Sequence, residues 1–243
     1  MNTSSPTRVR FAPSPTGYLH IGGARTALYN YLFAKINGGS MVLRIEDTDR
    51  NRYIKDSEKQ LIKDLKWLGI SWDEGPDVGG IYSPYTQSER TKLHRSHAEQ
   101  LVNIGKAYYC FCDKARLQSI RSKHKGYDEH CREIDTDIAL EKVTSGEEHT
   151  IRFRSPKQGT TTVDDLIRKN ITVKNEQLED FVLFKADGFP VYHLAAMVDD
   201  HLMGITHVIR GEEWLSSIAK HALIIRAFGW SEPIWCHLSV LTQ

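Results

Sequence analysis

Long apolar runs are absent from this sequence, and none approaches the roughly 18 residues that a membrane-spanning helix needs. We therefore expect no membrane partner. Residues Met1–Pro6 are polar and lack the apolar core and the cleavage signal of a secretory leader. These two absences together predict a cytoplasmic protein.

Cysteine is scarce, and neither sign of charge is in excess. Four cysteines in 243 residues are too few to hold a chain of this length together by disulfides. Three of them, Cys110, Cys112 and Cys131, fall in one segment, which suggests a metal. The formal net charge of +1 neither requires nor excludes a nucleic-acid partner, because local patches decide such binding.

Two short apolar stretches near the N-terminus predict buried strands. The first, Arg8–Ala12, leads into Pro13–Gly17, whose prolines and glycine exclude regular structure and predict a loop. The second is Met41–Ile45, followed at once by the carboxylates Glu46 and Asp47. Both expected strands therefore end at polar segments.

Helices are expected between and after these strands. The first should run to Ile36 with Leu28 and Leu32 on its apolar face. The next begins at Ser57 with a capping-box pattern, and another begins at Thr86. Strands separated by helices of this length imply a parallel sheet.

The middle of the chain has a different texture. Between Ala107 and about Lys185, short strand candidates are separated by charged and Thr-rich stretches, which indicates an insertion. The earlier pattern resumes with a helix over Tyr192–Met203. We therefore predict an α/β protein in which residues 1–106 and 187–243 form the two halves of one sheet and 107–186 form an α+β insertion.

The loop after the first strand has the features of an anion site. A helix that begins directly after a parallel strand attracts anions at its N-terminus. His20 could donate to a phosphate oxygen, and Gly22 and Gly23 would let a nucleotide lie against the backbone. From these residues alone, the alternative is a solvated loop before an ordinary helix.

A longer match favours the first interpretation. Residues 10–23, RFAPSPTGYLHIGG, resemble the "HIGH" signature region of class I aminoacyl-tRNA synthetases in its glutamate-specific form. Further blocks that resemble the same family follow in the same order: RIEDTDR at 44–50, GP at 75–76, YTQSER at 85–90, YHLA at 192–195, VDDHLMG at 198–204 and VIRGEEW at 208–214. The resemblance covers nearly the whole chain. It implies a Rossmann-like parallel sheet with helices on both faces, split by an insertion that binds the tRNA acceptor stem.

The resemblance implies ATP-dependent activation of L-glutamate and its transfer to the 3' end of tRNA(Glu). Glutamate carries two carboxylates and one ammonium, so Arg10 and Arg210 could each bind a carboxylate, and Glu46 suits the ammonium. The glutamate-binding residues expected on this basis are Arg10, Ala12, Ser14, Glu46, Tyr192 and Arg210. Without the resemblance, surface ion pairs would be the alternative for these arginines.

The same resemblance places the catalytic residues in the loop and the ATP site around it. The catalytic residues expected are His20, Gly22 and Gly23, and the ATP-binding residues are Thr16, Gly17, His20, Gly22, Glu213 and Trp214, with Mg2+ accompanying the ATP. For Trp214 alone, core packing is the alternative. Ala196 departs from the pattern because many relatives carry asparagine there, which affects the expected geometry of glutamate recognition.

The clustered cysteines predict a structural zinc site. Cys110 and Cys112 are two residues apart on an expected strand, which puts both sulfurs on one face. Zinc requires four ligands. A tRNA-modifying paralogue of the family uses the tyrosine of a Y-x3-C pattern, which Tyr127 and Cys131 reproduce. The expected Zn2+ ligands are Cys110, Cys112, Tyr127 and Cys131; His130, Glu133 or water could replace Tyr127, and free thiols are the alternative to a metal.

A basic segment in the insertion predicts contact with the acceptor stem. Its cations are Lys114, Arg116, Arg121, Lys123, Lys125 and Arg132. Such side chains bind phosphates and position a nucleic acid without reading its sequence. A solvated charged helix is the alternative.

Other functions are open at this level. A glutaminyl enzyme is disfavoured by residues 12–17. A second alternative is a short paralogue that attaches glutamate to a modified base of tRNA(Asp). Residues 47–50 and 212–214 fit the full synthetase better than this paralogue. A small-molecule adenylyltransferase would leave the insertion unexplained, and a tRNA-binding module without catalysis is a further alternative. The family's second loop, of the "KMSKS" type, is expected beyond residues 237–241, so we expect the sequence up to Gln243 to bind glutamate without appreciable adenylate formation.

Overall fold

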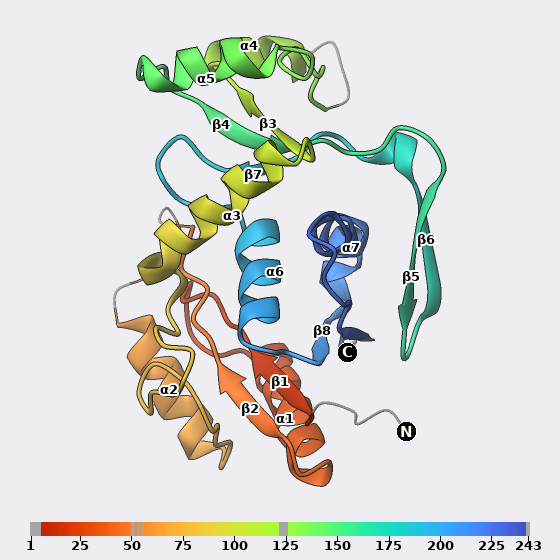
Figure 1. The fold of residues 1–243 in the computed structure, drawn as a ribbon. Helices are drawn as coiled ribbons and strands as arrows, with labels where there is room; N and C mark the ends of the chain where they lie inside the picture. The colour runs from red at the N-terminus through yellow and green to blue at the C-terminus, as the bar shows by residue number, and fades with distance from the viewer. Residues whose placement is uncertain (1–5, 50–51, 53, 55, 122–125, 242–243) are drawn as a thin grey trace.

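The computed structural model describes residues 6–49, 52, 54, 56–121 and 126–241 (Figure 1). Its strands are β1 Arg8–Phe11, β2 Ser40–Leu43, β3 Ala107–Cys110, β4 Thr150–Phe153, β5 Thr160–Asp165, β6 Lys169–Lys174, β7 Val182–Phe184, β8 His207–Gly211 and β9 Ile234–Leu238. Its helices are α1 Ile21–Ile36, α2 Ser57–Trp67, α3 Thr91–Asn103, α4 Lys114–Arg121, α5 Thr136–Thr144, α6 Tyr192–Leu202 and α7 Ile218–Ala227, with short 3-10 helices η1 Gln87–Arg90, η2 Asn175–Gln177 and η3 Glu212–Ser217. Among the helices described, none has the length and apolarity needed to cross a bilayer.

Two parallel strand pairs form the centre of the molecule. β1 pairs with β2, and β8 pairs with β9, each in parallel register. The pairs meet where the N–H of Thr206 donates to the carbonyl oxygen of Arg8 at 2.9 Å. Arg25, near the start of α1, donates to the carbonyl oxygen of Ser239 just past β9 at 2.6 Å. The carboxyl ends of β1 and β9 therefore lie at the same edge.

Helices cover both faces of this parallel layer. Successive residues of a strand point to opposite faces. In β8, Val208 packs in a core that includes residues of α3, α6 and α7, whereas Ile209 packs in a second core with residues of α1 and α2. The two cores confirm the predicted α/β fold class.

The segment from β3 to β7 departs from the parallel pattern. β3, β4 and β7 form an antiparallel sheet beneath α4 and α5 (Figure 1). β5 and β6 form an antiparallel hairpin. This hairpin returns to the parallel layer, where Asp165 of β5 lies beside Trp235 of β9 and the N–H of Leu166 donates to the Trp235 carbonyl oxygen at 2.9 Å.

The prediction for the buried face of α1 is wrong. Leu28 and Leu32 are 42% and 46% exposed, while Ala27, Asn30 and Ala34 are buried. The small alanines allow the helix to lie close to β1 and β8. Asn30 also donates to the carbonyl oxygen of Ile209 at 3.1 Å, a polar contact that apolar periodicity does not reveal.

Three local predictions also need correction. Ser57 does not cap α2, because Asp56 occupies the cap position in a left-handed conformation and makes no side-chain cap. The Ser57 hydroxyl instead donates to the carbonyl oxygen of Pro15 at 2.8 Å, which ties α2 to the loop after β1. Cys112 lies beyond the end of β3 rather than on that strand. Thr86 precedes the 3-10 helix η1, and the α-helix begins only at Thr91.

Candidate active site and metal cluster

A buried network of charges lies at the carboxyl ends of β1 and β2. Oδ1 of Asp200 accepts from Nη1 of Arg44 at 2.7 Å and from Nε of Arg10 at 3.1 Å. Nη2 of Arg44 donates to Oε1 of Glu46 at 2.9 Å. All four side chains are at most 7% exposed. Burial raises the pKa of Glu46, and the Arg44 guanidinium opposes that rise.

Arg210, at the end of β8, occupies a different environment. Its Nε donates to Nε2 of His237 at 2.9 Å, and its Nη1 lies 2.9 Å from Nδ1 of His221 and 3.4 Å from the hydroxyl of Tyr192. Its Nη2 is buried without a hydrogen-bond partner. Within the described part of the chain, Arg210 makes no ion pair. Burial lowers its pKa.

Tyr192 joins these two groups of side chains. Burial raises its pKa to about 12; the charges of Arg210 and Arg10 oppose the rise, and Glu46 adds to it. Arg210 contacts the hydroxyl directly, and the charges of Arg10 and Glu46 are near enough to act on it. Four of the six residues expected to bind glutamate, Arg10, Glu46, Tyr192 and Arg210, therefore lie in one neighbourhood.

The remaining two residues lie on the loop beside this neighbourhood. The N–H of Glu46 donates to the carbonyl oxygen of Pro13 at 3.0 Å, between Ala12 and Ser14. Ala12 is half-buried and Ser14 is exposed. The backbone contact places both next to Glu46.

The loop residues expected to handle ATP surround the start of α1. Nδ1 of His20 accepts from the N–H of Gly23 at 3.2 Å, so the ring caps the helix and Nε2 is left as its other polar atom. Both His20 and Thr16 are exposed. A Cβ at Gly22 would lie 3.1 Å from the His20 ring. These glycines therefore allow the ring to fold back over the helix terminus.

Glu213 and Trp214 lie in η3, which follows β8 at the same edge. The ring of Trp214 packs on Tyr192 with centroids 4.2 Å apart, while Glu213 is exposed. Oε1 of the adjacent Glu212 accepts from the N–H of Val240 at 2.9 Å. Trp214 is thus half-buried against Tyr192, one of the residues expected to bind glutamate, and lies at the edge where ATP is expected.

Sequence reasoning missed several members of this site. Arg44 and Asp200 lie in quoted family blocks but were given no role. His221 is a single histidine outside the quoted blocks, and His237, although it begins the stretch 237–241, was given no role. Asp165 lies in the insertion, far from the other members along the chain, and only the strand contact of β5 with β9 brings it near.

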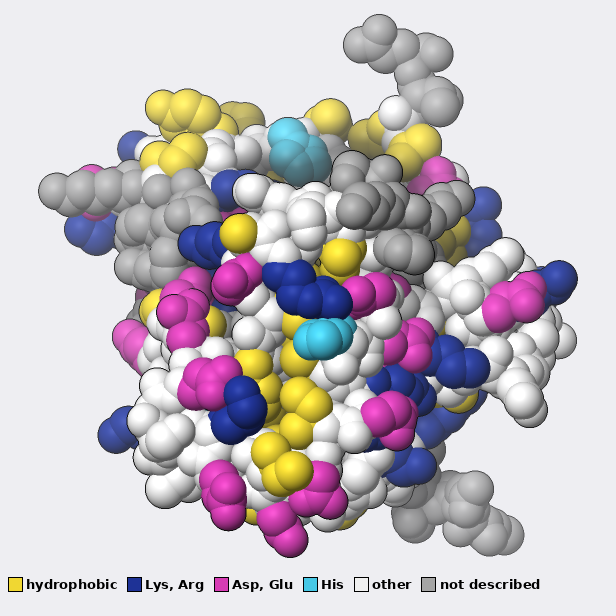
Figure 2. Space-filling view, turned by 90° about the horizontal axis from the view of Figure 1, so that it is seen from above, with side chains coloured by type: hydrophobic (Ala, Val, Ile, Leu, Met, Phe, Trp, Pro, Cys, Tyr) yellow, Lys and Arg dark blue, Asp and Glu magenta, His cyan; other side chains and the backbone are white. Residues whose placement is uncertain are grey.

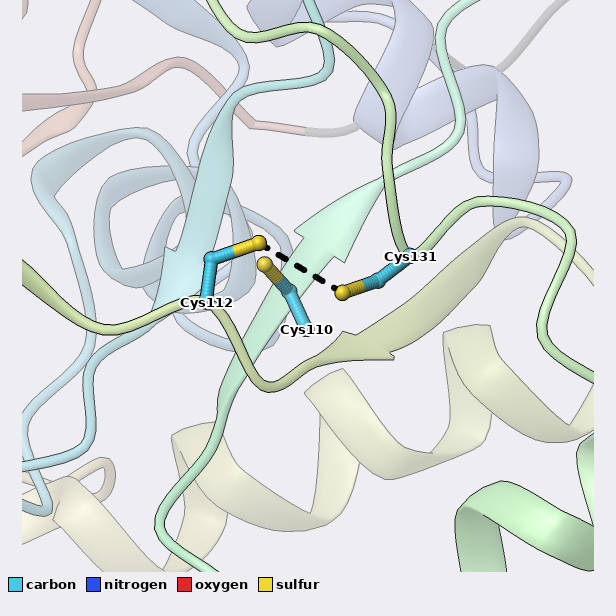
Figure 3. Close-up of side chains that lie close together, drawn as sticks. All are labelled: Cys110, Cys112 and Cys131. Atoms are coloured by element: carbon cyan, nitrogen blue, oxygen red, sulfur yellow. Dashed lines mark hydrogen bonds between the residues drawn. The ribbon is translucent and has the colours of Figure 1, made fainter. Parts of the chain in front are cut away.

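Three cysteine sulfurs converge in the insertion (Figure 3). Those of Cys110, Cys112 and Cys131 all lie within 4.8 Å of one another, and Cys112 and Cys131 are 3.6 Å apart. The hydroxyl of Tyr127 lies 3.3 Å from Cys110 and 3.7 Å from Cys112. The chain thus bends after β3 so that Cys112 still reaches the cluster. This cluster could hold a metal ion, as the spacing predicts.

The surroundings favour a thiolate at Cys110, whereas burial raises the pKa of Cys112, and a hydrogen bond with Cys110 raises that of Cys131. Arg152 donates through Nε to the sulfur of Cys110 at 3.3 Å and stacks over the Tyr127 ring at 3.8 Å. A hydrogen bond from Cys131 lowers the pKa of Cys110; burial opposes this, and Tyr127 and Arg152 support it. Three soft sulfurs and a phenol oxygen form a donor set of the kind that zinc accepts.

The predicted basic surface is largely neutralised where the structure describes it. Arg116 pairs with Asp128 at 2.6 Å, and Arg132 pairs with Asp180 at 2.6 Å. Lys123 and Lys125 lie outside the described residues, as does the side chain of Arg121. Figure 2 shows basic and acidic side chains interspersed on the face seen from above. A single-sign patch is therefore not evident in the described part of this face.

Comparisons with known proteins show the family to which the chain belongs. The family model of the catalytic domain of class I tRNA synthetases (E and Q) matches residues 6–243. The glutamate-tRNA ligase of Fusobacterium nucleatum subsp. nucleatum is 50% identical over 240 residues, covering 96% of this chain and 47% of that protein. The glutamate-tRNA ligase of Dehalococcoides mccartyi (strain ATCC BAA-2266 / KCTC 15142 / 195) is 49% identical over 244 residues, covering 98% and 49%.

A solved structure gives the same result at the level of fold. The glutamate tRNA ligase of Elizabethkingia meningosepticum, determined in complex with its amino acid, superposes with a TM-score of 0.92 at 43% identity. The match covers 98% of this chain and 50% of that one. The chain thus spans about half the length of the relatives it matches.

Proposed function

The chain belongs to the family of class I tRNA synthetase (E and Q) catalytic domains, and on this premise we propose that it carries the site at which L-glutamate is activated with ATP for transfer to tRNA(Glu). The convergence of Arg10, Glu46, Tyr192 and Arg210 carries the proposal. Two cations, a phenol and a carboxylate match the two carboxylates and the ammonium of glutamate.

Each end of glutamate has its own partners in this assignment. Glu46 binds the ammonium, with the backbone of Ala12 and the hydroxyl of Ser14 beside it. Arg10 and Arg44 both donate to Asp200, and Arg44 also pairs with Glu46. Arg210 instead lies against Tyr192. Arg10 therefore faces the α-carboxylate, next to the ammonium. Arg210 and Tyr192 face the side-chain carboxylate.

The loop and the helix terminus bind the nucleotide. Thr16, Gly17, His20 and Gly22 hold the phosphates with Mg2+, Gly23 shapes the start of α1, and Glu213 and Trp214 contact the adenosine. An oxygen of the α-carboxylate attacks the α-phosphorus of ATP, and the bond to pyrophosphate breaks. His20 donates through Nε2 to the phosphate as charge moves onto the leaving group. Positioning and charge neutralisation supply most of the acceleration.

Transfer to tRNA completes the reaction. A hydroxyl of the terminal ribose attacks the carbonyl carbon of the adenylate, forms the ester and releases AMP, while its proton passes to solvent. In this proposal residues 107–186 form the acceptor-stem-binding insertion, between catalytic halves 1–106 and 187–243. Zn2+ bound by Cys110, Cys112, Tyr127 and Cys131 would fix the segment between β3 and α5.

Calorimetry tests the core of the proposal. The 243-residue chain should bind glutamate and should bind glutamine at least about tenfold more weakly, because an amide cannot neutralise buried Arg210. No heat of binding with millimolar glutamate would contradict it. For the full-length protein, pyrophosphate exchange with glutamate, glutamine and tRNA identifies the amino acid that is activated.

The position of Tyr127 among the sulfurs favours a second candidate. The hydroxyl of Tyr127 lies beside Cys110. This arrangement fits the Y-x3-C pattern of the paralogue that attaches glutamate to a modified base of tRNA(Asp). The two activities differ in the nucleotide that receives the amino acid. Mapping labelled glutamate to the terminal adenosine would support charging of tRNA(Glu), and mapping it to an internal base would support the paralogue.

A further inference from the structure

Three histidines and one aspartate are joined through Arg210 in a continuous series of hydrogen bonds. Asp165 contacts Nδ1 of His237 at 2.7 Å, and Nε2 of His237 accepts from Arg210 at 2.9 Å. On the other side, Arg210 lies 2.9 Å from Nδ1 of His221, and Nε2 of His221 lies 3.0 Å from Nδ1 of His193. These side chains come from β5, β9, β8, α7 and α6. This series of hydrogen bonds thus links β5 through β9 and β8 to α7 and α6, two helices that pack on the same face of the parallel layer.

Hydrogen-bond geometry fixes the tautomer of His237. Both oxygens of Asp165 already accept backbone donors: Oδ1 from Ile167 and Arg168, and Oδ2 from the N–H of His237. A carboxylate that accepts this many hydrogen bonds is ionised and can only accept. Nδ1 of His237, which contacts it, therefore carries the hydrogen. Nε2 of a neutral His237 is then a lone pair, and it accepts from Nε of Arg210.

The same reasoning fixes His221. The guanidinium of Arg210 can only donate, so Nδ1 of His221 must accept. The hydrogen of His221 is therefore on Nε2, where His193 accepts it. A proton added to either ring would place a second cation against Arg210 in a fully buried position. Burial and Arg210 accordingly lower the pKa values of His221 and His237, the latter to about 4.

The outcome is an unusual distribution of donors on Arg210. Nε and Nη1 are held by neutral acceptors, whereas buried Nη2 has no hydrogen-bond partner among the described residues. Arg44, by contrast, is paired with two carboxylates. An arginine that is 4% exposed, without a carboxylate partner, and with one free donor group is prepared for an anion from outside the chain.

We propose that His237 and His221 are positioning residues for amino acid specificity, two neutral acceptors that hold Arg210 with its Nη2 group free for the side-chain carboxylate of the substrate. Asp165 acts one step further out, by fixing the tautomer of His237. This inference rests on the proposed function, because it takes glutamate as the ligand of Arg210. It assigns specificity to residues that do not touch the substrate.

Calorimetry on variants tests the positioning role. His237→Leu keeps the ring's bulk but removes the acceptor, so Arg210 can turn its Nε away from the required orientation. We expect glutamate affinity to fall at least about tenfold and glutamine affinity to change less than about threefold. His237→Gln, which can still accept at this position, should recover most of the loss. The control is His201→Leu, because His201 lies in α6 and takes no part in the hydrogen bonds around Arg210.

Nitrogen NMR of the wild-type side chains provides a test that does not depend on variant folding. At pH 7, His237 should be the Nδ1–H tautomer and His221 the Nε2–H tautomer, both neutral. The opposite tautomer or an imidazolium at either residue would overturn the proposal. The proposal would also be overturned if His201→Leu lowered the ratio of glutamate affinity to glutamine affinity as much as His237→Leu does. An unchanged ratio in folded His237→Leu would overturn it as well. Failure of the wild type to bind glutamate would instead contradict the proposed function.

Discussion

Arg44 and Asp200 form an ion pair from which water is almost excluded. Nη1 of Arg44 lies 2.7 Å from Oδ1 of Asp200, and the two side chains are 0% and 3% exposed. The same aspartate oxygen accepts from Arg10. Arg10 and Glu46, both expected to bind glutamate, are therefore held by a pair that is almost completely shielded from solvent.

Breaking this pair should destabilise the protein strongly. Arg44→Met retains an unbranched side chain but leaves Asp200 and Glu46 without their main partner. We expect the free energy of unfolding to fall by about 3 to 5 kcal/mol, the range for a stranded buried charge. Urea unfolding followed by circular dichroism measures this loss.

An exposed pair provides the matched control. Arg95 pairs with Glu99 at 2.9 Å, with side-chain exposures of 47% and 40%. Arg95→Met should cost less than about 1 kcal/mol, because solvent screens such pairs. A comparable loss in the two variants would contradict a structural role specific to the buried network.

The second prediction concerns Arg210. Arg210→Ala should weaken glutamate binding by about 2 to 4 kcal/mol, because the substrate carboxylate would lose its buried partner. Titration calorimetry on the folded variant measures this change. Arg226→Ala in α7 is the control, since that arginine is 42% exposed and pairs with Glu232. Unchanged affinity in Arg210→Ala would reject its assignment to the pocket.

The sequence predicts the arrangement of elements better than their packing faces. Strand and helix order follows from apolar stretches and turn residues, and both fold class and family are confirmed. The buried face of α1 was mispredicted because Leu28 is more apolar than Ala27, although only the smaller side chain fits against the sheet. Periodicity reports hydrophobicity, while close helix packing also depends on size.

The site shows a similar division. Arg10, Glu46, Tyr192 and Arg210 could be named from motifs, and they lie together in the structure, while their roles stay predictions. His237 could not be named, because its importance depends on Arg210 in a neighbouring strand and on Asp165 across a long insertion. Contacts between such distant segments leave no local pattern in one sequence.

The third prediction concerns metal. Protein purified without chelator should contain about one zinc per chain, and Cys131→Ser should lose it. Cys236→Ser is the control, since Cys236 is buried outside the cluster. Elemental analysis measures the content. Absence of metal from the wild type would contradict the site, and full retention of zinc in Tyr127→Phe would assign the fourth position to another group.

The last prediction is a loss of stability in mild acid. Burial and the charge of Arg210 lower the pKa of His237 to about 4, and they also lower that of His221. In the unfolded chain both should titrate near about 6.5. Below that pH the unfolded state binds more protons than the folded state, so stability is fully present above about pH 6.5 and falls as the pH drops toward the folded pKa values.

Below about pH 6.5 and above its folded pKa, each of these two histidines should lower the free energy of unfolding by about 1.4 kcal/mol for each pH unit of acidification. Asp199 acts in a separate window: although burial opposes it, the hydrogen bond from His94 lowers its pKa to about 2, so its contribution is lost only below about pH 4. Urea unfolding at pH 7, 6 and 5, with chelator present so that metal release does not contribute, measures the slope. His237→Gln should reduce this pH dependence of the unfolding free energy by the contribution of one histidine, because glutamine does not titrate. Equal unfolding free energies at pH 5 and pH 7 in the wild type would show that the buried rings do not have the neutral state on which the orientation of Arg210 depends.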